Sequence, residues 1–256
     1  MGRRFTQIMQ LFQEQDFWTV NQLAEKLNVS LMTIRRDLDE MESKKLIRRL
    51  HGGAVAIKTQ NNEPFYSDRA NAQVNEKKAI AKEAVSLIKD NTVIAIDSGS
   101  TCLELVHLIK DRKLTVVTNS FRVMEAFLYS DTIKVIVPCG TLRSQEGAIS
   151  GPDTVDFLAK LHVDQFFMGI GGVESNSGLT DYSIEDVAVK KRIIANASSV
   201  ITLADSTKFN RVTFASIGNA SDTDILISDR KPDGKLLDYL QRCGVKIIYP
   251  DNKEEK

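Results

Sequence analysis

Most of this chain alternates between short apolar runs and longer amphipathic segments, and few folds accommodate that alternation. The apolar runs have the length and the β-branched content of buried strands, at residues 92–96, 114–118, 133–137, 164–169, 200–204, 225–228 and 245–249. Helical periodicity fills most of the intervals, at residues 76–89, 101–110, 121–128, 152–161, 183–196 and 233–242. Because a helix usually joins parallel neighbours, the pattern predicts an α/β domain with a mainly parallel sheet covered on both faces.

The beginning of the chain follows a different pattern, in which short helices come first. A first helix is predicted over residues 4–15, and Thr19 and Gln22 have the spacing of a capping box that starts a second helix. After a short turn at residues 28–29, Ser30 can cap a third helix with an apolar inward face made by Ile34, Leu38 and Met41. Two short helices joined this tightly predict a helix-turn-helix.

The outward face of the third helix carries Met32, Thr33, Arg35 and Arg36, which suits the DNA major groove. Residues 46–55 then predict a short hairpin with a glycine turn, the wing of a winged helix, with arginines that could lie along phosphates. Residues 1–58 hold ten Lys and Arg against seven Asp and Glu, although the whole chain has 34 of each. This excess of three positive charges is modest, so its placement on the third helix and the hairpin matters more than its size.

The chain between these two patterns is polar and contains Asn61-Asn62-Glu63-Pro64. We therefore predict a winged helix-turn-helix domain over residues 1–57, a linker over residues 58–75 and an α/β domain over residues 76–256. The three cysteines are far apart and have neither zinc nor dithiol spacing, and no apolar run approaches a membrane span. These features predict a cytoplasmic protein with no membrane contact.

In an open α/β sheet, ligands bind outside the carboxyl ends of the strands, so the residues that follow each strand are candidates. The clearest is the turn Asp97-Ser98-Gly99-Ser100-Thr101, whose hydroxyls and backbone N–H groups could hold a phosphate at a helix N-terminus. A tight turn before a capped helix explains the same residues about as well. Further polar or glycine-rich segments follow other strands, at residues 119–120, 140–143, 169–172 and 205–208.

An enzymatic alternative comes from Asp181, Glu185 and Lys190, because a carboxylate base beside a lysine could isomerise a sugar phosphate. The charges of residues 185–192 are equally typical of the solvent face of one helix with i,i+4 ion pairs, and the sequence favours that interpretation. The histidines have no metal spacing and no nucleophile partner: His51, His107 and His162. We therefore predict no metal, no cofactor and no catalytic residue.

One string is more specific than these patterns. Val29-Ser30, Thr33-Ile34-Arg35-Arg36-Asp37-Leu38 and Ile47, followed by Arg49-Leu50-His51-Gly52-Gly53-Ala54, resemble the DNA-binding module of DeoR-type bacterial transcription regulators. The resemblance continues over almost the whole chain, at Arg69, Glu76-Lys77, Ile80-Ala81, residues 97–101, Val117-Thr118-Asn119, Gly140, Leu142-Arg143, Gly151, Asp205-Ser206 and Lys208-Phe209.

The resemblance implies a repressor of a carbohydrate operon, with a C-terminal domain that has a ribose-phosphate-isomerase-like fold and binds a phosphorylated sugar. It implies DNA contacts from Ser30, Thr33, Arg35, Arg36, Arg48, Arg49 and His51. It implies an effector site formed by Asp97, Ser98, Gly99, Ser100, Thr101, Asn119, Gly140, Arg143, Gly171, Asp181, Glu185 and Lys208. One short reading helix covers little DNA, so we expect a homodimer or homotetramer on paired half-sites of a double-stranded operator.

Two other functions fit part of the pattern. The first is a sugar-phosphate isomerase with an accessory winged-helix domain, which predicts turnover of ribose or hexose phosphates. The second is a winged helix that binds a protein partner, which predicts that replacing Arg35 and Arg36 with Ala leaves DNA affinity unchanged.

Overall fold

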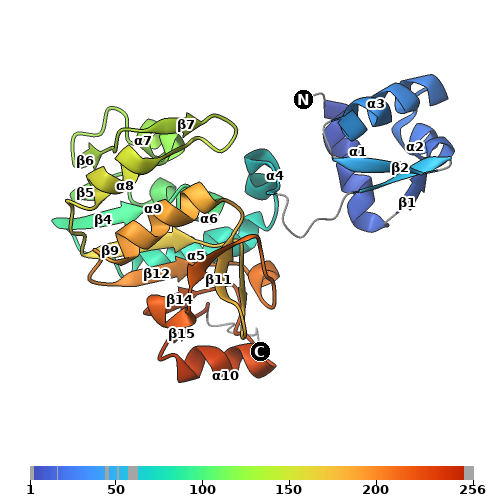
Figure 1. Ribbon diagram of the computed structural model, residues 1–256. Coiled ribbons are helices and arrows are strands. Elements are labelled where there is room, and N and C mark those ends of the chain that lie inside the picture. Colours follow the sequence, from blue (N-terminus) through green and yellow to red (C-terminus); the bar gives the residue numbers. More distant parts are fainter. Residues whose placement is uncertain (1–2, 16, 44–45, 51, 57–62, 251–256) are drawn as a thin grey trace, which may run out of the picture. The chain divides into compact units, whose positions relative to one another are not determined.

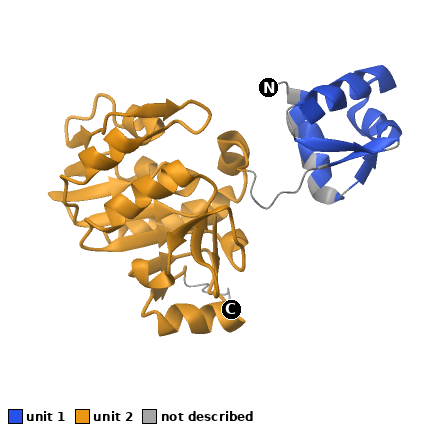
Figure 2. Cartoon of the chain, in the orientation of Figure 1, with its two compact units in different colours: residues 1–59 blue, residues 60–256 orange. Residues whose placement is uncertain are grey.

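The computed structural model describes residues 3–15, 17–43, 46–50, 52–56 and 63–250 (Figure 1). The chain divides into two compact units, residues 1–59 and residues 60–256 (Figure 2). The first unit contains one cluster of buried apolar side chains and the second contains two. Each unit therefore has a hydrophobic core of its own, as expected of a domain.

The first unit is a winged helix. Its described helices are α1 (Arg3–Glu14), α2 (Val20–Leu27) and α3 (Leu31–Ser43), and its antiparallel sheet consists of β1 (Phe17–Thr19), β3 (Gly53–Ala56) and β2 (Ile47–Leu50). The apolar positions that predicted the helices pack into one core, which includes Ile8, Phe12, Leu23, Ile34, Leu38 and Met41. The predicted helices, the capping box of Thr19 and Gln22, and the wing hairpin are confirmed.

Strand β1 was not predicted, because three residues are too few to show an alternating pattern. It pairs with β3, so that Trp18 lies opposite Ala54 and Thr19 opposite Gly53. Gly53 permits this close approach, since a Cβ there would lie 2.3 Å from the carbonyl oxygen of Trp18. The wing is therefore hydrogen-bonded to the segment between α1 and α2.

The second unit is built on a seven-stranded parallel sheet of order β15-β14-β12-β9-β4-β5-β6. The strands are β4 (Thr92–Ile96), β5 (Leu114–Val117), β6 (Ile133–Ile136), β9 (Gln165–Gly169), β12 (Val200–Leu203), β14 (Ile225–Ile227) and β15 (Lys246–Ile248). Each lies within one residue of its predicted bounds at either end. The prediction of a mainly parallel sheet is confirmed.

Helices cover both faces of this sheet. One core cluster contains side chains of α5 (Val74–Val85), α6 (Ser100–Leu108) and α7 (Phe121–Ala126). The other contains side chains of α8 (Pro152–Leu158), α9 (Ile184–Ile194) and α10 (Gly234–Arg242). Both faces of the sheet are therefore buried, which explains why its strands are continuous apolar runs.

The strand order reverses between β4 and β9. From β4 the chain proceeds to β5 and β6 on one side, and from β9 it proceeds through β12 and β14 to β15 on the other. In open α/β sheets the crevice at such a reversal, outside the carboxyl ends of the strands, is the usual ligand site. The topology therefore directs attention to the residues that follow β4 and β9.

Several short elements around these carboxyl ends were not predicted. They are the hairpin of β7 (Thr141–Arg143) and β8 (Ala148–Ser150), and an antiparallel sheet of β10 (Gly172–Glu174), β11 (Gly178–Asp181) and β13 (Ala215–Gly218). Each strand has three or four residues, and several include glycine, so neither length nor alternation indicated them.

The predicted linker over residues 58–75 is wrong in its second half. Residues 66–71 form α4 (Tyr66–Asn71), and α5 begins at Val74. Tyr66 is buried and the guanidinium of Arg122 lies 3.5 Å from its ring centroid. The polar composition that suggested a linker belongs instead to a segment that packs on the second unit.

Candidate functional sites

The N-terminus of α3 is capped as predicted. The Ser30 hydroxyl accepts a hydrogen bond from the backbone N–H of Thr33 at 3.1 Å, and the two hydroxyls lie 2.8 Å apart. This bond satisfies a backbone donor that the helix leaves without a partner. Ser30 therefore fixes where α3 begins, and Thr33 lies half-buried on its first turn.

Arg35 and Arg36 are both exposed on α3. Within the part of the chain that the structure describes, neither guanidinium has a hydrogen-bond or ion-pair partner. The two flanking residues point inward: Ile34 is fully buried, and Asp37 is buried in an ion pair with Arg4. The inward face of α3 thus holds the helix in place, while its outward face presents two free cations.

The two wing arginines differ. Arg48 is exposed, whereas the side chain of Arg49 donates to the Asp39 carboxylate at 2.6 Å and its backbone N–H donates to Glu42 at 2.8 Å. Arg49 therefore holds the wing to α3, a role that the sequence did not suggest. The seventh predicted DNA contact, His51, lies outside the described residues.

Apolar side chains also lie on the outward face of α3: Met32 was predicted there, and Leu31 was not. Met32 is 70% exposed and Leu31 is 43% exposed on the first turn of α3. Exposed apolar residues next to arginines suit a groove in which thymine methyl groups alternate with polar base edges. Their only signal was their place on the outward face of the helix.

The predicted effector residues lie in loops and short elements that follow the strands of the sheet. The segment 97–101 follows β4, Asn119 follows β5, and Lys208 lies in the short 3-10 helix Ser206–Lys208 after β12. Gly171 lies between β9 and β10, and Asp181 ends β11. The remaining three are Gly140 before β7, Arg143 at the end of β7, and Glu185 in the first turn of α9.

A buried ion triad lies at the carboxyl ends of β4 and β9, where Asp97 follows β4 and Gly169 ends β9. The Lys190 ammonium lies 2.9 Å from Oδ2 of Asp97, forms an ion pair with Asp181, and donates to the carbonyl of Gly169 at 2.6 Å. Asp97 also accepts from the backbone N–H of Gly169 at 3.0 Å, which joins β4 to β9. Burial alone would lower the pKa of Lys190, but the two carboxylates outweigh it and raise the pKa. Lys190 is therefore held as a cation.

This triad corrects the solvent-face interpretation of residues 185–192. Lys190 and Asp186 are buried, whereas Glu185 and Lys191 are exposed. Glu185 accepts a hydrogen bond from the Ser183 hydroxyl at 2.8 Å. Only part of the surface of α9 is solvated, because Asp186 and Lys190 are buried against their partners Arg143 and Asp181.

The turn after β4 leaves the N-terminus of α6 without a side-chain cap. Gly99 is the N-cap residue and no side chain bonds to the first N–H groups of the helix. Ser98, Gly99 and Ser100 are half-buried, while Thr101 is buried. The structure thus has the predicted tight turn but not the capping bond, so these donors are free to bind an anion.

Cations gather beside this turn. Lys77 of α5 is buried, and its ammonium donates to the carbonyls of Arg69 and Ala72 at the end of α4. Burial lowers the pKa of Lys208; Asp205 opposes this shift, and Arg211 and Arg69 add to it. Burial likewise lowers the pKa of Lys77, Asp205 opposes this, and Lys208 adds to it. Among the described residues the Lys208 ammonium has no hydrogen-bond or ion-pair partner. The edge of the sheet beside the turn 98–101 is therefore electropositive.

Two other predicted residues have structural roles that are visible in their packing. Asn119 is buried, its Nδ2 donates to the carbonyl of Ile149 at 3.0 Å, and its Oδ1 accepts no hydrogen bond from the described residues. Gly140 has φ +150°, and a Cβ there would lie 2.1 Å from the Thr154 hydroxyl. Glycine at this position is thus required by the backbone as well as by space.

The guanidinium of Arg143 forms ion pairs with two carboxylates. Its Nη2 lies 2.7 Å from Oε2 of Glu63, and its Nη1 forms an ion pair with Asp186. Burial would lower its pKa, but Asp186 and Glu63 raise it, so Arg143 is always charged. Glu63 and Arg69 were not predicted to belong to this site, because both fell within the supposed linker.

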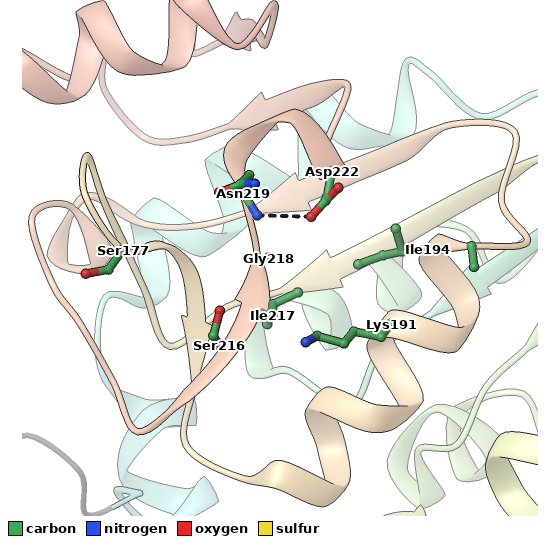
Figure 3. A pocket seen from close by; sticks show the side chains of 9 residues that line it. Ser177, Lys191, Ile194, Ser216, Ile217, Gly218, Asn219 and Asp222 are labelled. Atoms are coloured by element: carbon green, nitrogen blue, oxygen red, sulfur yellow. Dashed lines mark hydrogen bonds between the residues drawn. The ribbon is translucent and has the colours of Figure 1, made fainter.

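A separate hollow of about 590 Å³ lies along β13 and the C-terminal half of α9 (Figure 3). Lys191 and Asp222 are the charged residues of its lining, and Asp222 accepts from the backbone N–H of Asn219 at 3.0 Å. It includes none of the predicted site residues. Within the described residues, no group of His, Cys, Asp and Glu could hold a metal ion, and no helix is long and apolar enough to cross a membrane.

Comparisons with known proteins agree with both halves of this description. Residues 4–60 match the family model of the DeoR-like helix-turn-helix domain, and residues 72–230 match that of the DeoR C terminal sensor domain. A solved ribose 5-phosphate isomerase A from Methanocaldococcus jannaschii matches with a TM-score of 0.41 and 21% identity, covering 54% of this chain and 55% of that one. A likeness of this size says nothing about activity.

Curated relatives match over nearly their whole length. The HTH-type transcriptional repressor CsqR of Escherichia coli (strain K12) is 33% identical over 96% of this chain and 95% of its own. The glycerol-3-phosphate regulon repressor of the same organism is 32% identical, covering 93% and 94%. The L-fucose operon activator of Haemophilus influenzae is 29% identical, covering 97% and 100%. The chain therefore belongs to the DeoR family of transcriptional regulators.

Proposed function

We propose that this chain is a sequence-specific repressor of a carbohydrate operon. We further propose that a phosphorylated sugar, bound at the carboxyl ends of β4 and β9, controls its affinity for double-stranded DNA. The sugar phosphate would sit on the second unit, and the operator on α3 of the first. The proposal assigns binding roles and no catalytic role to the residues of the second unit.

The DNA half of the proposal is supported by the contrast between the two faces of α3. Arg35 and Arg36 are exposed and unpaired among the described residues, although Arg49 and Arg4 nearby are both bound to carboxylates. An arginine that its own protein leaves unpaired beside such carboxylates is suited to phosphates or guanine edges. We assign the operator contact to Arg35, Arg36 and Thr33, with Arg48 on the wing.

The effector half is carried by the N-terminus of α6, which has no side-chain cap, together with the ammonium of Lys208, which has no bonded partner among the described residues. Backbone donors at a helix N-terminus and a nearby cation together bind phosphate groups well. The neighbouring Ser98, Ser100 and Thr101 add hydroxyl donors. We therefore place the phosphate at the turn 98–101 and the sugar over the triad of Lys190, with Asn119 and Gly171 at its sides.

The names of the relatives support the class of effector and leave its identity open to experiment. Glycerol-3-phosphate regulon repressors are among them, which favours a small phosphorylated polyol or sugar. An L-fucose operon activator is among them as well, so the relatives differ in the sign of regulation. We propose repression for this chain because repressors are the first of the relatives described above.

Two binding measurements test the two halves. The protein should prefer its own upstream DNA over a random duplex of equal length at physiological salt, and a failure to discriminate would contradict the regulator proposal. A screen of sugar phosphates by thermal shift on the full chain should find a ligand that stabilises it by mass action. That ligand should lose most of its affinity when Lys208 is replaced by Met.

The isomerase alternative predicts turnover of ribose or hexose phosphates. We propose that the protein has no such activity, because Lys190 is locked as a cation and Asp181 is bound to it, which removes both as a proton-transferring pair. Loss of a sugar phosphate substrate in an assay with pure protein would contradict this. We also propose a cytoplasmic homodimer or homotetramer, to be measured by sedimentation with and without operator DNA.

A further inference from the structure

The carboxylate of Glu63 lies between two arginines of the second unit. Its Oε2 is 2.7 Å from Nη2 of Arg143, and its Oε1 is 3.3 Å from Nη1 of Arg69. The side chain of Glu63 is 17% exposed, and those of Arg69 and Arg143 are 19% and 27% exposed. One carboxylate thus bridges two cations in a place largely shielded from water.

Each arginine has a second carboxylate that does not depend on Glu63. Arg69 forms an ion pair with Glu146 through Nη2, and Arg143 forms one with Asp186 through Nη1. The five side chains therefore alternate in charge, in the order Glu146, Arg69, Glu63, Arg143, Asp186. If Glu63 left, both guanidinium groups would still be held from their outer sides, each with one Nη free.

That arrangement is the geometry of an anion site. Two oriented guanidinium groups, each with a free Nη on the same intervening space, match the oxygens of a phosphate or a carboxylate. The cluster contains three carboxylates and only two arginines. One carboxylate is therefore in excess, and Glu63 is the one shared by both arginines. Burial raises the pKa of Glu146, the charge of Arg69 lowers it, and the charge of Glu63 raises it again, as expected where three carboxylates share two arginines.

The Glu63 cluster adjoins the proposed effector site. The backbone carbonyl of Arg69 accepts from the Lys77 ammonium, and the Ser100 hydroxyl at the start of α6 lies 3.5 Å from the same carbonyl oxygen. The charge of Arg69 also lowers the pKa of Lys208. Arg69 is therefore shared between the anion position of Glu63 and the turn where we place the phosphate.

We propose that Glu63 is an internal competitor, which fills the anion position between Arg69 and Arg143 until a second anionic group of the effector, distinct from the phosphate at the turn 98–101, displaces it. The proposal rests on the proposed function, because it assigns a regulatory step to the same ligand site. Glu63 comes shortly after residue 59, where the first unit ends. Its release would free from the second unit the residues just before α4, through which the chain passes to the DNA-binding unit, while α4 stays held by Tyr66 and Arg69.

The test compares the affinity of the full chain for inorganic phosphate in three proteins. Glu63→Gln removes the competing charge, and we expect it to bind phosphate roughly fivefold or more tightly than the wild type, because the arginine site no longer has an internal occupant. Asp68→Asn is the matched control, since Asp68 lies on α4, carries the same charge and forms no ion pair among the described residues. Its affinity should stay within about twofold of the wild type.

Two further arms locate the effect. Adding Arg143→Gln to Glu63→Gln should abolish the gain in phosphate affinity, whereas adding Lys208→Met should leave the gain in place. Glu63→Asp keeps the charge and shortens the side chain, so it should give an intermediate gain and provides a second variant if Glu63→Gln folds poorly. In the wild type, phosphate should increase the amide hydrogen exchange of residues 63–65, which precede α4.

Each other outcome has a definite meaning. Unchanged or weaker phosphate binding in Glu63→Gln would show that Glu63 orients the arginines, which overturns the proposal while leaving the effector site in place. Increased protection of residues 63–65 on addition of phosphate would overturn it as well. Failure of sugar phosphates to bind the wild type, together with tight phosphate binding by Glu63→Gln, would instead contradict the proposed function and support an anion site used for something else.

Discussion

At the scale of single residues, the second unit depends on charges that are paired out of reach of solvent. A buried triad is formed by Lys190, Asp97 and Asp181 at the carboxyl ends of β4 and β9. Burial of each charge is tolerated only because the opposite charge is present. Lys208 differs, because the described residues give it neighbouring charges but no bonded partner. The first arrangement is suited to stability and the second to binding.

Replacing Lys190 with Met should destabilise the second unit strongly, because two buried carboxylates would lose their cation. We expect a loss of about 3–5 kcal/mol in the free energy of unfolding, measured by urea denaturation. Lys191→Met removes the same charge from the exposed neighbouring position and should leave stability unchanged within error. Equal free energies of unfolding in the two variants would show that the ion pairs of Lys190 do not stabilise the second unit.

The affinity for a sugar phosphate should decrease as the pH rises into the alkaline range. The folded protein holds the pKa of Lys208 below the ordinary 10.5, so the free site loses this proton at a lower pH than an isolated lysine would. A bound phosphate favours the charged ammonium and raises the pKa again, so binding takes up a proton in this window. Calorimetry at several pH values should show weakening above neutral pH.

Lys208→Arg is the control for this pH dependence, because arginine stays charged throughout the range. Its affinity should stay nearly level over the same pH values. An equally steep decline in Lys208→Arg would mean that another group is responsible.

At the scale of elements, α3 separates stability from recognition by its two faces. Replacing Arg35 or Arg36 with Ala should cost about 1–3 kcal/mol of operator affinity each, with no change in the melting temperature because neither side chain has a partner among the described residues. Arg242→Ala removes an exposed arginine from the second unit and should leave operator affinity unchanged.

The salt dependence of binding distinguishes the kinds of contact made by these arginines. Loss of a phosphate contact should lower the slope of log affinity against log salt by about one, whereas loss of a base contact should relax sequence preference at one position. DNA affinity that survives both alanine substitutions would favour a protein partner for the winged helix.

The elements that sequence analysis predicted correctly are those with a repeating pattern. Each strand of the parallel sheet is a continuous apolar run, and Ile34, Leu38 and Met41 recur at helical spacing, so burial determined the pattern directly. Strands β1, β7 and β10 have three residues each and show no period. Helix α4 is short and polar, and its fold depends on a partner far along the chain.

The candidate sites were predictable to the same extent. The turn after β4 was recognisable because small hydroxyl residues and glycine follow an apolar run. The pairing of Arg49 with Asp39, of Lys190 with Asp97, and of Glu63 with Arg143 joins residues far apart in sequence. Local patterns carry no signal for such contacts, so roles that depend on them became visible only in the folded chain.

At the scale of the whole molecule, we assign DNA binding to the first unit and effector binding to the second, so a signal must pass between them. A ligand can change operator binding only by its preference between two states of the protein, so the size of the response measures that preference. Residues 63–72 belong to the second unit and adjoin the first in sequence. They are therefore where we expect occupancy of the effector site to be transmitted.

The most direct test titrates the full chain against labelled operator DNA, with and without the sugar phosphate that stabilises it best. We expect the ligand to change operator affinity at least about tenfold, and we expect Lys208→Met to bind operator normally but no longer to respond. Unchanged operator affinity at a ligand concentration that demonstrably saturates the wild-type protein would show that the ligand does not control DNA binding.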